Sequence, residues 1–270
     1  MLRAMALQAQ RQSVAARIRT EVQLYGQHLA GSGTYVQGPA QPGAWRLELR
    51  MQTDDGSTSL VQVCDGAQLW TYRQAADRPL LERVDAGIVA AALARREKER
   101  SAGSAPPQMP VGLGLGYGGL PRLLRMLSEA FDYRAINEGR LEGMPVWILE
   151  GTWTPELLAV LLPEQKGAIE AGQGVQLAKL PTHIPDRVTL YLGRDDLFPY
   201  RLEYHRDHLG EKEWERAERA NPPHSIVKLE WFEVRFDLPL ARDQFAFDPG
   251  ETKYEDATKR YLESLGLPTP

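Results

Sequence analysis

The sequence is poor in cysteine and has no long apolar run. Its one cysteine, Cys64, cannot form an internal disulfide, and it excludes a metal site built from several cysteines. No uninterrupted apolar stretch approaches the roughly 18–20 residues that a membrane-spanning helix needs. The segment after Met1 is rich in Arg, Gln and Ala and lacks the apolar core of a signal peptide. These absences exclude a disulfide-stapled fold and a helical membrane protein.

An excess of positive charge is also missing. The 270 residues contain 32 Lys and Arg against 36 Asp and Glu, which gives a net charge of -4 with neutral histidines. Nucleic-acid binding draws on clustered positive charge, so this composition is a poor candidate for it. Hydrophobic residues at 43% and charged residues at 25% are ordinary for a globular protein. Neither a nucleic-acid-binding protein nor a disordered chain is therefore expected.

Apolar periodicity predicts a helix near the N-terminus, followed by strands. Residues 14–29 carry apolar side chains at spacings of three and four, which is typical of an amphipathic helix. Apolar and polar residues then alternate over 45–51, and further short apolar runs occupy 60–64 and 68–72. Because Asp-Gly turns separate these runs, they predict an antiparallel meander.

Two further helices and a second group of strands follow. Helical spacing of apolar residues returns over 80–100 and 121–131. Later strands are predicted at 133–141, 146–152, 188–192, 200–204, 226–237 and 245–247, and a helix at 254–265. Together these elements predict the α+β class, with an antiparallel sheet of about eight or more strands and helices packed on one face. A single domain over 1–270 is expected, with insertions near 94–120 and 154–186.

No constellation of catalytic residues stands out. His205 and His208 are spaced like two metal ligands on a helix and Glu203 lies close by, but no further ligand is designated. Cys64 lies in an apolar strand, where a structural thiol is expected. The Gly-rich run 112–119 lacks the Lys-Ser or Lys-Thr of a phosphate-binding loop, and is interpreted as a surface loop or a lipid-facing flap. No catalytic residue, metal site or cofactor is therefore predicted.

Large apolar residues that alternate along the predicted strands are the most prominent feature. They can line one face of the sheet beneath helices at 84–93 and 120–131, and they can equally form an ordinary core. The residues expected to line a binding site are Trp45, Leu47, Leu49, Val61, Val63, Leu69, Ile88, Leu123 and Leu127.

Four passages share their order and their residues with one known superfamily. An amphipathic segment runs into Gly-x-Gly-x-Tyr at 31–35, and large apolar residues alternate over 44–51. Residues 63–72, VCDGAQLWTY, are similar to a V-x-D-G-x-x-L-W-x-Y hairpin, and residues 245–250, FAFDPG, to an F-x-F-x-P-P-x-G ending. In this order the passages resemble the LolA-like and LppX-like superfamily of lipid-binding proteins and periplasmic lipoprotein carriers.

The resemblance implies an incomplete antiparallel β-barrel whose helices form a lid over a concave apolar face. That face would bind acyl chains of lipids or lipoproteins for transport or sorting across the periplasm toward the outer membrane. It also implies a non-enzymatic protein with membrane-bound donor and acceptor proteins as partners, and a signal peptide removed ahead of this sequence. LolA itself has a basic residue before the alternating strand that fastens the lid. Residues 39–43, PAQPG, contain none, so lid control is expected to differ.

Two alternatives stay open at this point. One is a protein-interaction module with the same fold, a filled core and a partner docked on an exposed strand edge. The other is a hydrolase with a metal held by Glu203, His205 and His208.

Overall fold

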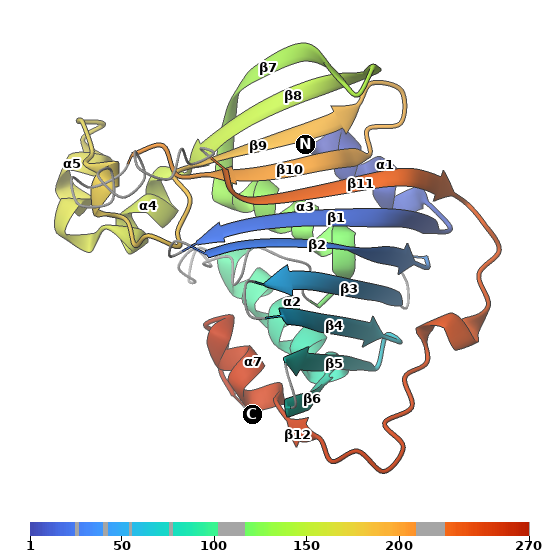
Figure 1. Cartoon of the computed structure of the whole chain (residues 1–270). Helices are drawn as coiled ribbons and strands as arrows, with labels where there is room; N and C mark the ends of the chain where they lie inside the picture. The colour runs from blue at the N-terminus through green and yellow to red at the C-terminus, as the bar shows by residue number, and fades with distance from the viewer. Residues whose placement is uncertain are drawn as a thin grey trace. The chain divides into compact units, whose positions relative to one another are not determined.

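Strands dominate the chain, and helices separate them in blocks (Figure 1). The computed structural model describes residues 1–24, 27–39, 43–53, 56–75, 78–101, 117–208 and 225–269. The first elements are α1 (Leu2–Gln10), β1 (Val14–Leu24), β2 (Gln27–Gln37), β3 (Trp45–Thr53), β4 (Gly56–Cys64), β5 (Gln68–Ala75), β6 (Arg78–Asp85), α2 (Ala86–Ser101) and α3 (Gly119–Ala130). The later ones are β7 (Phe131–Leu141), β8 (Met144–Trp153), α4 (Pro155–Leu161), η1 (Pro163–Gln165), α5 (Lys166–Glu170), η2 (Leu177–Lys179), β9 (Arg187–Gly193), β10 (Pro199–His205), β11 (Ser225–Phe236), η3 (Arg242–Phe245), β12 (Glu255–Asp256) and α7 (Thr258–Ser264). Within these ranges, no helix is both long enough and apolar enough to cross a membrane.

The strands form one sheet in the order β12-β6-β5-β4-β3-β2-β1-β11-β10-β9-β8-β7. β12 pairs with β6 in parallel, and the other pairs whose register is described are antiparallel. Because β12 and β7 stand at the two ends of this order, the sheet is open. The predicted α+β class with an open antiparallel sheet is confirmed, with twelve strands among the described residues where about eight or more were predicted.

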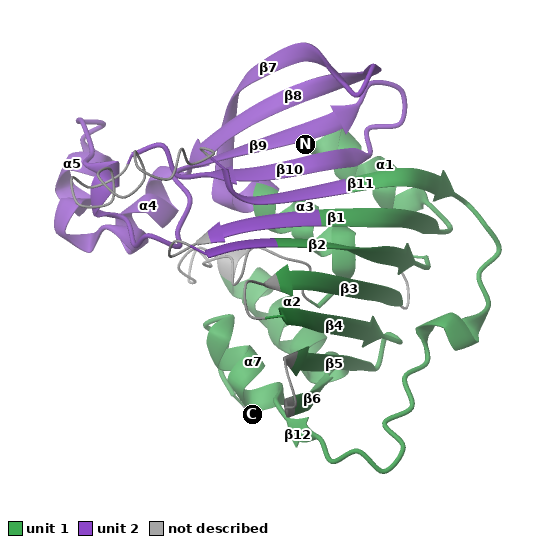
Figure 2. Ribbon diagram, in the orientation of Figure 1, with its two compact units in different colours: residues 1–19, 30–127, 231–270 green, residues 20–29, 128–230 purple. Residues whose placement is uncertain are grey.

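The chain divides into two compact units (Figure 2). Unit 1 comprises residues 1–19, 30–127 and 231–270, and unit 2 comprises residues 20–29 and 128–230. Unit 1 therefore holds the meander from β3 to β6 with α2 and α7, and unit 2 holds the strands from β7 to β10 with the insertion at 154–186.

The sequence predicts a helix over 14–29, but the described residues of this range lie in strands: 14–24 in β1 and 27–29 in β2. β1 buries Val14, Ala16, Ile18 and Thr20, so burial repeats every second residue. A spacing of four between apolar residues fits the period of a strand as well as that of a helix. The β-branched residues among them favour the strand, and the helical prediction is wrong here.

The helix predicted over 80–100 begins later than expected. Residues 78–85 form β6, and α2 starts at Ala86. Asp85 sets this boundary because its carboxylate accepts the backbone N–H of Ile88 at 2.9 Å, which caps the first turn of the helix. The apolar residues before Asp85 therefore belong to the sheet, whereas the helix predicted at 121–131 matches α3.

The remaining predicted elements differ in how well they match. The strands predicted at 45–51, 60–64, 68–72, 133–141, 146–152, 188–192, 200–204 and 226–237 all correspond to observed strands. The predicted strand at 245–247 is wrong, since η3 ends at Phe245 and the chain continues without strand pairing. The predicted C-terminal helix is shortened to α7. Most of the Gly-rich run 112–119 and much of the insertion at 94–120 lie outside the described residues.

Candidate functional site

One face of the meander in unit 1 is apolar. Trp45, Leu47 and Leu49 alternate along β3 and are between 0% and 7% exposed. Residues directly opposite each other on neighbouring strands share a face, and the register extends this surface over five strands, β2 to β6. We call it the apolar face; its buried apolar members are Tyr35, Trp45, Leu47, Leu49, Cys64, Leu69 and Val84. These members offer hydrocarbon and aromatic contacts, whereas the rows of Leu47 and Leu49 continue into polar residues of β4, β5 and β6: Gln62, Thr71, Arg73 and Glu82.

Cys64 belongs to the apolar face and is free and buried. Burial raises the pKa of its thiol to about 11. The thiol is therefore protonated at neutral pH and is a poor nucleophile, which fits the structural role expected for it.

Helix α3 begins on the apolar face. Its first residue, Gly119, has a positive φ of 58°, and a Cβ there would lie 2.8 Å from the Tyr35 hydroxyl and 3.1 Å from Cγ of Trp45. Only glycine tolerates both this conformation and this approach. The helix then buries four leucines at spacings of three, one and three; we call this set the leucine stripe: Leu120, Leu123, Leu124 and Leu127. The sequence thus places a hydrocarbon ridge on the helix that starts at the sheet.

A polar contact fixes the start of α3. The Tyr35 hydroxyl accepts the backbone N–H of Leu120 at 3.0 Å and donates to Oε1 of Gln37. Burial raises the pKa of Tyr35, so the phenol keeps its proton at any physiological pH. The hydroxyl can therefore hold both hydrogen bonds at once.

The space between α2, α3 and α7 is almost filled. A hollow of about 20 Å³ remains there, lined by Leu93, Tyr117, Arg122, Leu123, Met126, Tyr261 and Leu265. The backbone N–H of Tyr117 donates to the Tyr261 hydroxyl at 2.7 Å across its edge. This volume holds about one water molecule. An acyl chain bound at this place would therefore have to displace side chains.

The residues predicted to line a site are divided between different surfaces. Trp45, Leu47, Leu49 and Leu69 share the apolar face, and Leu123 and Leu127 are buried on α3. The other three, Val61, Val63 and Ile88, lie elsewhere.

Val61 and Val63 project from the opposite face. Val63 pairs with Arg46 and Val61 pairs with Glu48, so the two valines share the face of those charged residues. The sequence could not show to which face the two valines point, because apolar residues are consecutive at 60–61 and at 63–64 and do not alternate with polar ones. Ile88, on α2, is 39% exposed. Missing from the predicted set were Tyr35, although its motif was noted, and Leu120.

The second face of the meander, which we call the polar face, carries Arg46, Glu48 and Arg50 on β3. Nε of Arg46 donates to Oε1 of Glu48 at 2.6 Å. A hollow of about 440 Å³ opens on this face. Its lining is Arg17, Ser32, Gly33, Thr34, Glu48, Leu49, Arg50, Ser59, Val61 and Phe232. Two residues of the predicted lining, Leu49 and Val61, thus contribute to a hollow whose lining mixes charged and hydroxyl residues with apolar ones.

The C-terminal segment covers part of the polar face. Trp70 stacks on Phe247 with ring centroids 5.5 Å apart and meets the edge of Tyr254 at 5.0 Å. Nη1 of Arg46 donates to the carbonyl of Ala246 at 3.3 Å. The passage FAFDPG is therefore held by aromatic contacts and a hydrogen bond rather than by strand pairing.

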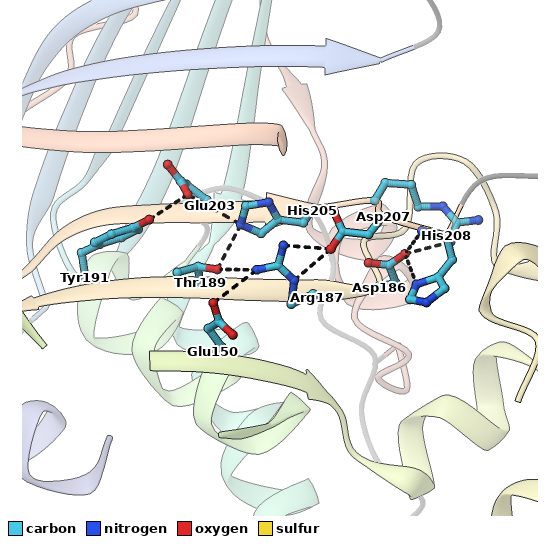
Figure 3. Close-up of polar contacts among 10 residues, drawn as sticks. Glu150, Asp186, Arg187, Thr189, Tyr191, Glu203, His205, Asp207 and His208 are labelled. Atoms are coloured by element: carbon cyan, nitrogen blue, oxygen red, sulfur yellow. Dashed lines mark hydrogen bonds and ion pairs between the residues drawn. The ribbon is translucent and has the colours of Figure 1, made fainter. Parts of the chain in front are cut away.

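Unit 2 contains a polar cluster that includes the two histidines noted in the sequence (Figure 3). Nε2 of His205 lies 3.0 Å from Oγ1 of Thr189 and 3.6 Å from Oε2 of Glu203. Nδ1 of His208 lies 3.1 Å from Oδ2 of Asp186 instead. Across the described ranges, no group of three or more His, Cys, Asp or Glu residues is arranged to hold a metal ion. The two histidines thus take separate partners.

The same cluster secures the insertion at 154–186. The side chain of Arg206 is 1% exposed and donates to the carbonyls of Leu177, Ala178 and Leu180. Its Nη1 also lies 3.6 Å from Oδ2 of Asp186, which is equally buried. The cluster therefore ties η2 and the segment after it to the end of β10, which is a structural role.

No protein-family model matches the sequence, and no curated protein matches it. Solved structures to which the chain is similar include an uncharacterized conserved protein from Thermus thermophilus, at 11% identity, with 94% of this chain and 98% of that chain covered and a TM-score of 0.46. Lipoprotein LppX from Mycobacterium tuberculosis is 12% identical over 90% of this chain and 96% of that chain, with a TM-score of 0.40. A LolA superfamily protein from Nitrosomonas europaea is 8% identical over 92% and 97%, with a TM-score of 0.30. The structural neighbours thus include members of the superfamily that the sequence motifs resemble.

Proposed function

We propose that this chain is a binding protein for the acyl chains of lipids or lipoproteins, and that the apolar face of unit 1 is the binding surface. The observation that carries the proposal is the leucine stripe of α3. Its four side chains form a continuous hydrocarbon ridge on a helix that begins over Tyr35 and Trp45 of the apolar face. An acyl chain offers the same kind of surface and can take the place of that ridge.

The free energies of burial make it feasible for an acyl chain to replace the leucine stripe on the apolar face. Burial of one CH₂ group contributes about 0.8 kcal/mol, so a chain of about 16 carbons gains about 12 kcal/mol. Burial of one leucine side chain contributes about 1.5–3 kcal/mol, which gives about 6–12 kcal/mol for the stripe. The two terms are of similar size, so acyl binding can offset the loss of the helix contacts. Cargo would then bind by displacing α3 rather than by entering an open cavity.

A role in transport or sorting extends this proposal. The V-x-D-G-x-x-L-W-x-Y passage forms the β4–β5 hairpin, which contributes Cys64 and Leu69 to the apolar face. On this basis we expect a periplasmic carrier, with membrane-bound donor and acceptor proteins, that performs no catalysis. The surface requires no cofactor, because apolar burial alone supplies the affinity.

Uptake of a fluorescent fatty acid by the purified chain tests the binding surface. Leu47→Asp places a charge in the apolar face and should abolish uptake while circular dichroism shows a retained fold. Should that variant fail to fold, Tyr35→Phe provides the second test, because it loosens α3 and should speed uptake. Unchanged uptake in a folded Leu47→Asp variant, or an unchanged uptake rate in Tyr35→Phe, would contradict the proposed surface.

The nearly filled space between α2, α3 and α7 favours a second candidate, a protein-interaction module. A hollow of about 20 Å³ is what a completed core shows. In that case the protein would take up no fatty acid and would act through its surface.

A further inference from the structure

The hollow on the polar face has the size and construction of a ligand site. Its volume of about 440 Å³ lies within the roughly 300–1,000 Å³ usual for small-molecule pockets. Five strands of the sheet contribute to it, namely β1, β2, β3, β4 and β11. Ser32, Arg50 and Ser59 lie on the opposite side of the meander from the apolar face, and Leu49 is the residue that both linings include, so the hollow is considered separately from the acyl-binding proposal.

The strand register places donors side by side across the hollow. Arg50 pairs with Ser32 on one neighbouring strand and with Ser59 on the other. Side chains in such a row share a face and have Cβ atoms about 4.5–5.5 Å apart. The next row along the same strands contains Thr34 opposite Glu48. The Arg50 side chain therefore starts between two hydroxyl-bearing residues, and a third, Thr34, lies one row away.

Several of these donors have no partner in the described part of the chain. Arg50 is exposed, and neither an ion pair nor a side-chain hydrogen bond engages it there. The hydroxyls of Ser32, Thr34 and Ser59 are likewise without a hydrogen bond among the described residues. An unoccupied fork of guanidinium donors flanked by hydroxyls is suited to an anion with several oxygen atoms.

The charge of the hollow is positive although the whole chain carries -4. Arg17 lies 3.5 Å from Glu233, but both side chains are about 60% exposed, so the pair is weak. The one acidic residue of the lining, Glu48, is already hydrogen-bonded to Arg46. Arg17 and Arg50 therefore leave a net positive potential over the hollow.

Apolar residues stand at the two ends of the lining, Phe232 on β11 and Val61 on β4. The ring of Phe232 lies 4.3 Å from Cζ of Arg19 and 5.7 Å from Cζ of Arg17, which orients it. Val61 is the apolar residue at the other side of the lining. The hollow thus offers cationic and hydroxyl donors together with a surface for the organic part of a ligand.

We propose that this hollow binds a phosphate group carried by a small organic moiety, such as a glycerophosphate or the headgroup of a phospholipid. Phosphate is preferred over carboxylate because two guanidinium groups and three hydroxyls supply more donors than two carboxylate oxygens can accept. Arg50 and Arg17 contact the phosphate oxygens, Ser32 and Ser59 complete the shell, and Val61, two residues from Ser59 on β4, contacts the organic part.

The test is isothermal titration of the full chain with glycerol 3-phosphate at constant ionic strength, with sodium chloride as the blank. We expect saturable binding at one site. Arg50→Gln should weaken it roughly tenfold or more, since it removes a charge-assisted bond. Arg134→Gln, an exposed arginine on β7 outside the hollow, is the matched control and should leave binding unchanged. A Ser59→Val variant tests the hydroxyl row without altering charge and should weaken binding.

Vesicles distinguish the two sources of phosphate. Binding of both glycerol 3-phosphate and phosphatidylglycerol vesicles, each weakened by Arg50→Gln, supports the site with a lipid headgroup as its ligand. Binding of glycerol 3-phosphate alone supports it with a soluble ligand. Binding of the vesicles alone would overturn the proposal in favour of a general membrane contact. An equal loss of affinity in Arg50→Gln and Arg134→Gln would also overturn it, because the effect would then follow from the net charge of the protein and not from this site.

Discussion

The hydroxyl of Tyr35 on β2 accepts the backbone N–H of Leu120 in the first turn of α3 at 3.0 Å. The first N–H groups of a helix have no partner within the helix and must find one elsewhere. In most helices a residue just ahead of the helix supplies that partner, whereas here a tyrosine 85 positions earlier in the chain does so. The helix that carries the leucine stripe is therefore capped by the sheet, and its first turn depends on that sheet contact.

The first prediction concerns this cap. Tyr35→Phe leaves the buried N–H of Leu120 and the side chain of Gln37 without their partner, and should lower the free energy of unfolding by about 1–3 kcal/mol. Chemical denaturation measures the change. Tyr72→Phe, which removes an exposed hydroxyl bonded to Gln74, is the control and should change stability little. Equal effects of the two variants would show that the cap is unimportant.

The second prediction concerns the close approach at Gly119. Gly119→Ala should destabilise the protein, because its φ is 58° and the new Cβ would lie 2.8 Å from the Tyr35 hydroxyl. Gly172→Ala isolates the backbone cost, since Gly172 has a φ of 64° with nothing within 4 Å of its Cβ position. We expect the melting temperature to fall further in Gly119→Ala. The same shift in both variants would argue against tight contact of α3 with the sheet.

The third prediction concerns pH. Burial, with a contribution from the nearby Arg187, lowers the pKa of His205 below its ordinary value of 6.5. The unfolded chain then binds a proton at a higher pH than the folded chain, so stability should fall as pH decreases from above 6.5 toward the folded pKa and should change no further below it. His205→Gln should show a shallower loss of unfolding free energy across this window. A variant with the same pH slope as the parent would contradict the assignment.

The fourth prediction concerns Arg206. Arg206→Met removes the donors to the carbonyls of 177–180 and leaves Asp186, itself 1% exposed, without its buried ion pair. Loss of one member of a buried pair costs about 3–5 kcal/mol. The insertion at 154–186 should become sensitive to limited proteolysis. Arg194→Met, which breaks an exposed pair with Glu138, should leave the cleavage pattern unchanged. Protection of the insertion in Arg206→Met would contradict this role.

Local signals sufficed for much of the fold. Alternation over 45–51 and Asp-Gly turns predicted the meander. A strand with one solvent-exposed and one buried face shows apolar residues at every second position of the sequence. The strands β1 and β2 were missed because the four-residue spacing of Val14 and Ile18 fits the period of a strand as well as that of a helix. Asp85 carried the signal for the start of α2, but the apolar residues before it continued the helical spacing.

The candidate site was less accessible to sequence reasoning. Leu60 and Val61 are both apolar and consecutive, so the sequence does not show which residues of β4 point to which face of the sheet. The prediction therefore placed Val61 and Val63 on the side of the meander opposite to the one they occupy. The contact of Tyr35 with Leu120 joins residues far apart in the chain, and no local pattern encodes it. The hollow around Arg50 depends on the registers of three strands, which only the assembled sheet reveals.

Native mass spectrometry of the purified chain, before and after organic extraction, tests the acyl-binding account most directly. The account predicts a bound species of fatty-acid or phospholipid mass that is lost on extraction, and it predicts renewed uptake when fatty acid or an acylated peptide is added back. A bare mass before extraction, together with no uptake of either added ligand, would contradict it and would leave the apolar face as a core.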